Sequence, residues 1–349
     1  MGSGAVSDLV GVVWWVGWLA IALTVALALQ VLVMRDRNRT RERRRARVFA
    51  TWRPLLFEHL LGGASALPPL PARDEEDFLL LWNQLQDGVR GEARARLNAL
   101  AESVGAHAAA RRLLSRGTAL GRLLAIRTLG QLGRAADYDD VARYLDERRC
   151  YLCLAAARAL MHIDVRRAPD DVLQRLPARP DWPVPLFATA LSEANPERLG
   201  AQFRALQGRL SPAELVRLLP LTSLLAGPFA DATLADLLTA SVDPEVVCAV
   251  LRAVRGPALL DHVRRACTHP VWAVRTQAAA ALGRVGGSGD RDALLALLKD
   301  RQWWVRYRAA QALTSGRFGP VAEIVELADR LQDRFARDIV AHALAEERA

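Results

Sequence analysis

Two cysteines in this sequence have the spacing of a metal or redox motif. Cys150 and Cys153 form a C-x-x-C pair, as in zinc ribbons and dithiol oxidoreductases. A zinc site needs a second pair of ligands at ribbon spacing, and a redox motif lies in a βαβ unit; the sequence has neither pattern. Four cysteines in 349 residues are no disulfide framework, which is typical of a reducing compartment. We therefore expect two helical thiols, one of them packed inward, and no bound metal or cofactor.

Other motifs of catalysis are missing from the sequence. Gly286 to Gly289 precede Asp290, but no G-K-[ST] follows, so we expect a turn between helices. Asp261 and His262 are adjacent, which places their side chains on different parts of a helix surface. Neither a G-x-S-x-G elbow nor an H-E-x-x-H pair occurs. The sequence thus predicts no catalytic residue and a protein that is not an enzyme.

Positive charge is concentrated in one short segment. The net charge is +9, and residues 35–47 contribute +6 of it, from eight arginines against Asp36 and Glu42. The chain after this segment carries only about +4, which argues against a nucleic-acid partner. Arginines next to an apolar run either contact anionic lipid headgroups or serve only to set the topology, and both interpretations stay open. They are Arg35, Arg37, Arg39, Arg41, Arg43, Arg44, Arg45 and Arg47.

An uncharged apolar run precedes these arginines. Residues 9–34 would form a helix of about 39 Å at 1.5 Å per residue, which exceeds the roughly 30 Å hydrocarbon core of a bilayer. A signal peptide would be shorter, with its basic residues before the apolar run. The sequence therefore predicts an uncleaved, single-pass transmembrane helix of a bacterial inner membrane. Because arginine marks the cytoplasmic flank, residues 1–8 are expected in the periplasm and the C-terminal domain in the cytoplasm.

The remaining chain has the composition of an all-α protein, rich in Ala and Leu and with only 6% aromatic residues. An Arg-rich juxtamembrane segment covers residues 35–48. Residues 49–71 are predicted to form a short surface helix and a Pro/Gly linker. The folded domain is expected over residues 72–349, and its first helices near 74–89, 92–104 and 106–115.

Leucines recur through the folded domain at intervals of 30 or 31 residues. A period of this length predicts a stack of helix pairs. The pattern is weakest near Leu221, because Arg217 interrupts the apolar face and Pro220 interrupts the helix. We expect an irregular repeat there. The recurring residues are Leu129, Leu160, Leu191, Leu221, Leu251, Leu282, Leu313 and Leu344.

The clearest repeats are residues 274–313, VRTQAAAALGRVGGSGDRDALLALLKDRQWWVRYRAAQAL. They resemble HEAT-like repeats of the phycobilisome-lyase type, in which a V-R-x-x-A-A-x-A-L-G helix, a Gly/Asp turn, a second helix and an Asp make one unit. The resemblance implies a right-handed α-solenoid in which Arg275, Asp300 and Arg306 have structural roles, Asp300 and Arg306 as bridges between neighbouring helices. His269 replaces the Asp of the preceding unit, which interrupts such a ladder. Bilin-lyase activity is not implied, because solenoids host unrelated functions.

The layout of the chain resembles a family of bacterial membrane HEAT-repeat proteins. The resemblance rests on the anchor, on LPPL at 67–70, on DEEDFLLLWNQLQDGVRGEARARLNAL at 74–100 and on RPDWP at 179–183. Members are often encoded beside a family-2 glycosyltransferase and an outer-membrane β-barrel thought to serve exopolysaccharide production. This implies a non-enzymatic scaffold for other proteins, among them an inner-membrane glycosyltransferase. The alternative is a ligand- or metal-dependent regulator or enzyme related to bilin-lyase and hydroxylase HEAT-like proteins.

Tryptophans begin several of the predicted repeat helices, at Trp182, Trp272, Trp303 and Trp304. Such side chains commonly fill gaps between repeats. Trp303 and Trp304 are adjacent, so one of them must face away from the core. This pair is the candidate contact for a protein partner.

Overall fold

A computed structural model of the chain describes the backbone of residues 3–224, 228–330 and 332–347; it does not describe the side chains of residues 3–14, 16, 17, 19–22, 37, 223, 228, 229 and 347. The described residues form α-helices and short 3-10 helices, with no strand among them. The chain divides into two compact units, Met1–Arg134 and Ala135–Ala349. The all-α prediction is confirmed for the described residues.

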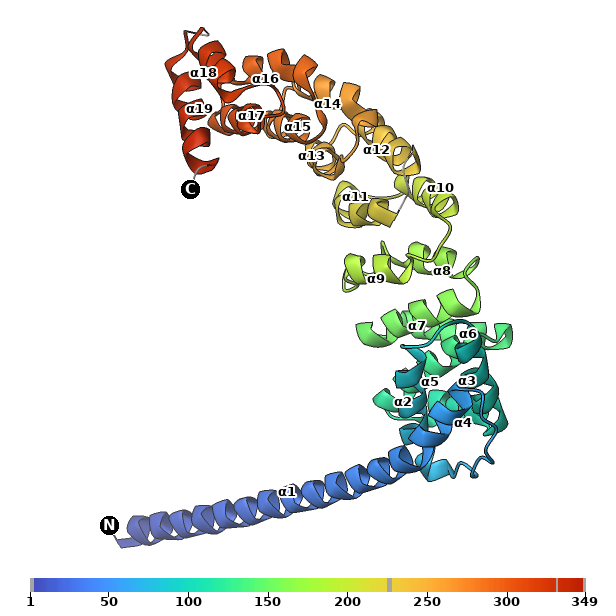
Figure 1. Ribbon diagram of the computed structural model, residues 1–349. Coiled ribbons are helices and arrows are strands. Elements are labelled where there is room, and N and C mark those ends of the chain that lie inside the picture. Colours follow the sequence, from blue (N-terminus) through green and yellow to red (C-terminus); the bar gives the residue numbers. More distant parts are fainter. Residues whose placement is uncertain (1–2, 225–227, 331, 348–349) are drawn as a thin grey trace. The chain divides into compact units, whose positions relative to one another are not determined.

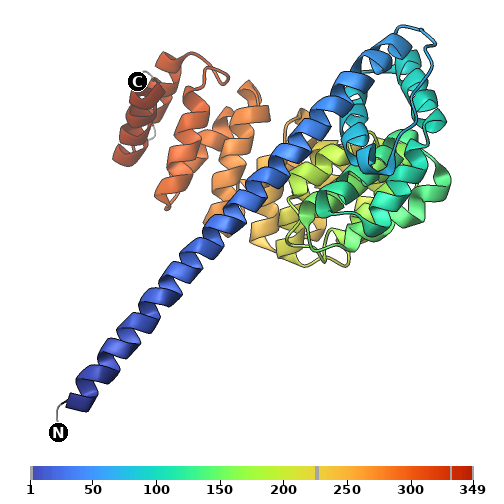
Figure 2. The same cartoon turned by 90° about the horizontal axis from the view of Figure 1, so that it is seen from below.

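Unit 1 consists of one long helix and four shorter ones. Helix α1 runs without interruption from Ser3 to Leu60, so the Arg-rich segment and the predicted surface helix are continuous with the apolar run. Figures 1 and 2 both show α1 leaving the other helices of unit 1 as a single rod. The others are the 3-10 helix η1 Ala72–Asp74 and α2 Glu75–Gln86, α3 Gly91–Ser103, α4 Ala106–Arg116 and α5 Ala119–Leu132.

The last turns of α1 belong to the core of unit 1. Val48, Trp52 and Leu56 are spaced four residues apart, so they form one stripe, and all three are buried. The Trp52 ring meets Phe78 of α2 edge to face, with centroids 4.7 Å apart. Composition alone predicts that the folded domain starts at residue 72. The packed core begins earlier, because buried apolar residues of α1 directly follow the arginines.

Helix α1 includes the predicted transmembrane segment, residues 9–34. Within that part of the chain, no helix combines the length and apolarity needed to span a bilayer. The predicted span, residues 9–34, includes many side chains outside the described set. Its crossing of a membrane stays a prediction.

Unit 2 is a stack of helix pairs. Helices α13, α15, α17 and α19 pack side by side along the stack, while α14, α16 and α18 form a second layer against them (Figure 1). The α-helices are α6 Tyr138–Ala142, α7 Cys150–Ile163, α8 Ala168–Arg175, α9 Val184–Ala190, α10 Pro196–Gln207, α11 Pro212–Leu218, α12 Pro228–Ala240, α13 Pro244–Ala253, α14 Leu260–Ala266, α15 Trp272–Val285, α16 Arg291–Leu297, α17 Trp303–Thr314, α18 Val321–Arg330 and α19 Arg334–Glu347. The 3-10 helices are η2 Ala135–Asp137, η3 Arg143–Asp146, η4 Leu219–Leu224, η5 Pro257–Leu259 and η6 Ser288–Asp290.

The leucine period marks one layer of this stack. Leu160, Leu251, Leu282 and Leu313 lie in α7, α13, α15 and α17, and each is fully buried. Their neighbours at i−4 are mostly alanine, which lets consecutive helices approach closely. Near Leu221 the expected irregularity occurs: α11 ends at Leu218 and the 3-10 helix η4 carries the chain past Pro220, whose ring supplies no N–H for an α-helical bond.

Candidate partner-binding groove

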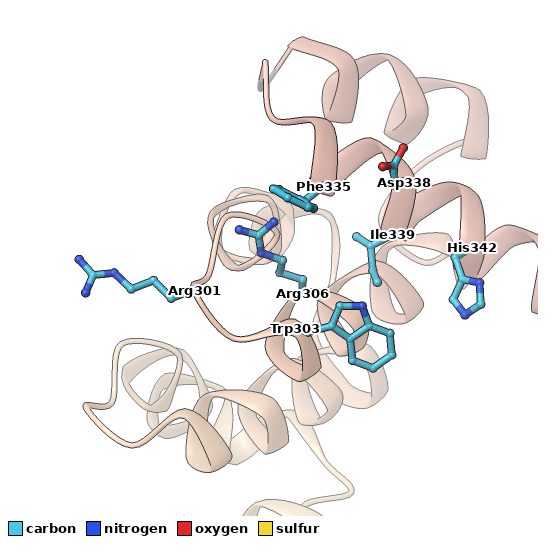
Figure 3. A pocket seen from close by; sticks show the side chains of 7 residues that line it. All are labelled: Arg301, Trp303, Arg306, Phe335, Asp338, Ile339 and His342. Carbon is cyan, nitrogen blue, oxygen red and sulfur yellow. The ribbon is translucent and has the colours of Figure 1, made fainter.

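A hollow in the C-terminal part of unit 2 lies between the starts of α17 and α19. It encloses about 510 Å³ and is lined by Arg301, Trp303, Arg306, Phe335, Asp338, Ile339 and His342. In Figure 3, Arg301 and His342 lie at opposite ends, with Trp303, Phe335 and Ile339 between them. We call this hollow the α17/α19 groove. Three of its lining residues are aromatic or aliphatic and four are charged or titratable, so it combines apolar contact with polar groups, as recognition sites do.

Exposed aromatic rings form one side of the groove. Trp303 and Trp304 are 48% and 53% exposed, and their rings meet edge to face at 4.7 Å. Trp303 also stacks on Tyr307, with centroids 5.0 Å apart and an interplanar angle of 9°. Both tryptophans are thus half-exposed, whereas the sequence requires only one to face away from the core. The helix begins at Trp303, so neither ring is covered by a preceding turn of the same helix.

The tyrosine beneath these rings is held by α19. The Tyr307 hydroxyl donates to Glu346 Oε2 at 2.6 Å and accepts from Gln311 Nε2 at 2.7 Å. The hydrogen bond to Glu346 raises the pKa of Tyr307. Its phenol therefore stays a neutral donor at physiological pH and fixes the stacked position of Trp303.

Two aspartates set where the groove's helices begin. Asp300 Oδ1 accepts the backbone N–H of Gln302 at 2.9 Å, just before α17. Asp333 Oδ1 accepts the N–H of Phe335 at 2.9 Å, at the start of α19. Each satisfies an N–H that has no partner within the helix. Trp303 is consequently held as the first residue of α17, and Phe335 as the second residue of α19.

The residues assigned structural roles by sequence do form a ladder along the stack. Arg275 binds the carboxylate of Asp300 through two hydrogen bonds, of 2.7 and 3.0 Å. One repeat later, Arg306 lies 3.7 Å from Asp333 and donates to the carbonyl oxygen of Asp300. Arg306 also covers the Phe335 ring, with its guanidinium carbon 5.2 Å from the ring centroid. These residues position the two helices, and Arg306 lines the groove as well.

The position of His269 matches that of Asp300 in the preceding repeat. Its Nδ1 accepts the N–H of Val271 at 3.1 Å, as Asp300 does for Gln302. Its carbonyl oxygen accepts from Arg275 at 2.7 Å. His269 thus makes the same backbone contacts as Asp300 but has no carboxylate to pair with an arginine. The sequence predicts this interruption of the row of ion pairs.

Other arginines bind carbonyl groups at the ends of helices. Arg217, which interrupts the apolar pattern, donates to the carbonyl oxygens of Leu176 at 2.6 Å and Pro177 at 3.1 Å. Arg179 of the RPDWP segment donates to the carbonyl oxygens of Leu145 and Glu147. Such carbonyls have no partner within their own helices, so the guanidinium groups stabilise the junctions between repeats.

The remaining tryptophans differ in burial. Trp182 is 1% exposed and stacks on Phe187 with centroids 4.0 Å apart, so it fills a gap between repeats. Trp272 is 43% exposed and begins α15, one repeat before Trp303. Sequence reasoning did not identify Tyr307, Phe335 or His342 with the Trp pair. The i, i+4 spacing of Trp303 and Tyr307 could have indicated their stacking.

The juxtamembrane arginines are not equivalent. Arg44 donates from Nε to Asp77 Oδ2 at 3.0 Å, so it holds α1 against α2 and is not free for lipid. Arg45 lies over the Phe49 ring at 5.1 Å, with its side chain still exposed. The side chain of Arg37 lies outside the described residues. The five others are exposed: Arg35, Arg39, Arg41, Arg43 and Arg47.

The C-x-x-C thiols are held as neutral side chains of a helix. Cys153 is buried, and its Sγ donates to the carbonyl oxygen of Glu147 at 3.1 Å. Burial raises the pKa of both Cys150 and Cys153. Among the residues with described positions, no group of three or more His, Cys, Asp or Glu is placed to hold a metal ion.

The other sequence motifs have structural partners. Asp261 pairs with Arg264 at 2.9 Å, while His262 lies 3.5 Å from Thr239, so the two do not act as one acid–base pair. The glycine-rich stretch forms the predicted turn, in which Asp290 Oδ2 accepts the N–H of Gly287 at 3.0 Å.

Comparison with known proteins identifies the repeats. A family described as HEAT repeats matches residues 232–314, which include α13 to α17. This part of the chain is therefore similar to HEAT repeats. The match covers less than half of the chain, and it includes Trp303, Trp304 and Arg306 but not α19. No curated protein matches the sequence.

The solved structures that match include the crystal structure of an engineered protein. It is 18% identical over 80% of this chain and 82% of that chain, with a TM-score of 0.29. HEAT repeats themselves are a protein-interaction architecture, because stacked helix pairs present an extended surface.

Proposed function

We propose that this chain is a membrane-anchored, non-enzymatic HEAT-repeat scaffold that holds a partner protein at the cytoplasmic face of a bacterial inner membrane. The observation that carries the proposal is the combination of an interaction architecture with a long helix whose described apolar side chains are exposed. The described apolar side chains between Leu23 and Met34 are 47% to 62% exposed. An apolar surface of that length in water is costly, and a bilayer would cover it.

The anchor follows from length and charge. Residues 9–34 carry no charge and exceed the bilayer core in helical length. The exposed arginines from Arg35 to Arg47 then fall at the cytoplasmic headgroups, where each contributes up to about 1 kcal/mol of attraction to anionic lipid. Arg44 is an exception, because it binds Asp77. The same charge asymmetry supports a periplasmic N-terminus.

Anchoring gives a scaffold a physical advantage. It confines the chain and a membrane partner to one thin layer, which raises their effective concentration, so a modest interface suffices. The resemblance in layout to membrane HEAT-repeat proteins makes an inner-membrane glycosyltransferase of exopolysaccharide synthesis the first partner to test. The α17/α19 groove, with its half-exposed tryptophans, is the surface that we assign to partner contact.

An anchor-exchange experiment tests the proposal. One variant lacks residues 1–34, and a second replaces residues 9–34 with an unrelated apolar span of the same orientation. The cut lies at residue 34 because Arg44, Val48 and Trp52 belong to the packed unit. If the proposal holds, deletion of residues 1–34 abolishes function in cells while the helical content persists. Exchange of residues 9–34 for the unrelated span restores function. Full activity of the detached chain would refute the tether.

Topology and partner are tested separately. A reporter active only in the periplasm should be silent when fused after Ala349 and active when placed before Leu9. In-cell crosslinking of the full chain should recover the glycosyltransferase, and the deletion variant should not. A reporter active at the C-terminus would reverse the proposed orientation.

A further inference from the structure

The α17/α19 groove has a charge pattern that indicates the chemistry of its occupant. Asp338 lies 3.6 Å from Arg334, which offsets its negative charge. Arg301 is exposed and has no ion pair with any described residue. Arg306 lies 3.7 Å from Asp333. The charged groups that line the groove are thus two arginines and one aspartate, so the charge of the lining is positive.

The apolar part of the groove is suited to one large side chain. Trp303 and Phe335 are 48% and 67% exposed, and Ile339 lies between them at 5% exposure. A hollow of about 510 Å³ falls within the range of sites that enclose a small ligand or a peptide anchor. Aromatic anchors seated in such pockets dominate many protein interfaces.

A cationic occupant is disfavoured by the same geometry. Aromatic cages for ammonium groups keep their ring faces free for the cation. Here Arg306 already covers the Phe335 ring at 5.2 Å, and Tyr307 occupies a face of Trp303. A second cation would meet Arg301 and Arg306 as like charges. An anionic segment instead gains their attraction, and its anchor contacts the parts of the Trp303 and Phe335 rings that Tyr307 and Arg306 leave exposed.

We propose that the α17/α19 groove binds a short acidic peptide segment of a partner protein through one aromatic anchor, which lies against Trp303 and Phe335 while flanking carboxylates pair with Arg301 and Arg306. This inference rests on the proposed scaffold function and supplies the chemistry of its contact. The preceding repeat offers a matched comparison: Trp272 stands one repeat before Trp303 and is 43% exposed, yet Pro270 occupies the place of Arg301. Trp272 does not line the groove.

Fluorescence anisotropy with three labelled peptides tests the proposal on the full chain. The first peptide has one tryptophan flanked by Asp and Glu, the second has Asn and Gln in place of the acids, and the third has Ala in place of the tryptophan. We expect the first to bind at least about tenfold more tightly than either other peptide, and to weaken as salt is raised. Equal binding of all three would overturn the proposal.

Variants locate the site. Arg301→Ala should weaken the first peptide by about five- to tenfold and leave the Asn/Gln peptide unchanged, and Trp303→Ala should weaken it by at least about tenfold. Trp272→Ala should change nothing, and circular dichroism confirms that each variant is folded. Equal losses for Trp272→Ala and Trp303→Ala would refute the groove as the site.

A competition experiment tests whether the groove prefers a nucleotide, which also combines an aromatic ring with negative charge. ATP at the peptide's own concentration should leave the bound peptide in place; its displacement would overturn the proposal. The outcome is independent of the tether. If the peptide binds but the anchor is dispensable, the proposed function is refuted and the groove remains a peptide-binding site. If the anchor is required but the peptide does not bind, the partner contact lies elsewhere on the chain.

Discussion

Arg275 and Asp300 form a two-point contact between consecutive repeats, with Nε and Nη2 of the arginine 2.7 and 3.0 Å from the two carboxylate oxygens. The side chains are 18% and 9% exposed. The same arginine donates to the carbonyl oxygens of His269 and Pro270, and the same aspartate accepts the N–H that precedes α17. One pair thus holds the segment before α15 and the segment before α17.

Removing the arginine should destabilise the solenoid strongly. Arg275→Ala leaves Asp300 largely buried without its counter-charge, and we expect a loss of about 3 kcal/mol in the free energy of unfolding. Urea unfolding followed by circular dichroism measures it. Arg330→Ala is the matched control, because its pair with Glu326 is exposed, and it should cost under about 0.5 kcal/mol. A loss for Arg275→Ala no larger than for this control would contradict the structural role.

The folded chain should become less stable as the pH is lowered, because paired carboxylates are protonated. Burial alone would raise the pKa of Asp300, but hydrogen bonds from Arg275 and the Gln302 N–H, with the arginine charges, lower it below its ordinary value of 3.8. Burial would likewise raise the pKa of Asp290, but hydrogen bonds from Arg264 and the Gly287 N–H lower it. A carboxyl with a depressed folded-state pKa contributes stability above its unfolded pKa and loses it as pH falls through the folded one.

We therefore expect the melting temperature to fall as the pH is lowered below about 4. Asp300→Asn should melt lower than the wild type at pH 7, because it lacks the charge, and should lose less on acidification. Melting curves between pH 7 and pH 2 test both points. An identical acid dependence for the wild type and Asp300→Asn would show that Asp300 does not contribute to it.

Much of the architecture could be predicted because it is encoded locally. The leucine period located the helices of one layer, since the inward face of each repeat must be apolar wherever the repeat lies in the chain. Helices at 91–103 and 106–116 lie within one residue of their predicted bounds. Pro220 likewise acts through its own ring, so the break near Leu221 was predictable.

Long-range contacts could not be predicted in the same way. Arg217 was an interruption of the apolar face in sequence, yet its guanidinium reaches carbonyls about forty positions earlier. The sequence predicts Trp52 in a surface helix, whereas in the structure its ring packs against Phe78. The groove combines Trp303 with Phe335 and His342 of the next repeat, and no motif joins them in sequence. Such sites depend on how repeats stack.

Glycine 283 should be intolerant of a methyl group. A Cβ on Gly283 of α15 would lie 2.9 Å from Ala312 Cβ and 3.3 Å from its Cα in α17, so the two helices would have to separate. We expect Gly283→Ala to cost about 1 to 3 kcal/mol, although alanine has the higher helix propensity. Gly208→Ala is the control, because nothing lies within 4 Å and its φ is −67°; it should be neutral or slightly stabilising. Unfolding midpoints compare the two, and a stabilising Gly283→Ala would mean that the helices are not in close contact there.

Thiol labelling distinguishes helical cysteines from a metal or redox site. A thiol reacts as its thiolate, so a raised pKa and burial both slow alkylation. Burial raises the pKa of Cys267 to about 12, and it raises the pKa of Cys153 and Cys248 as well. Cys150 is the partly exposed member of the four.

We expect iodoacetamide to modify Cys150 first in the folded chain, the other three much more slowly, and all four rapidly in urea, as followed by mass spectrometry. Cys150→Ser should remove the fast phase and leave the helical circular-dichroism spectrum unchanged. Because Cys153 already donates to the Glu147 carbonyl oxygen, added zinc or a chelator should not alter either rate. Protection of both thiols by zinc, or equal rates for Cys150 and Cys153, would instead assign the C-x-x-C pair a ligand-binding role.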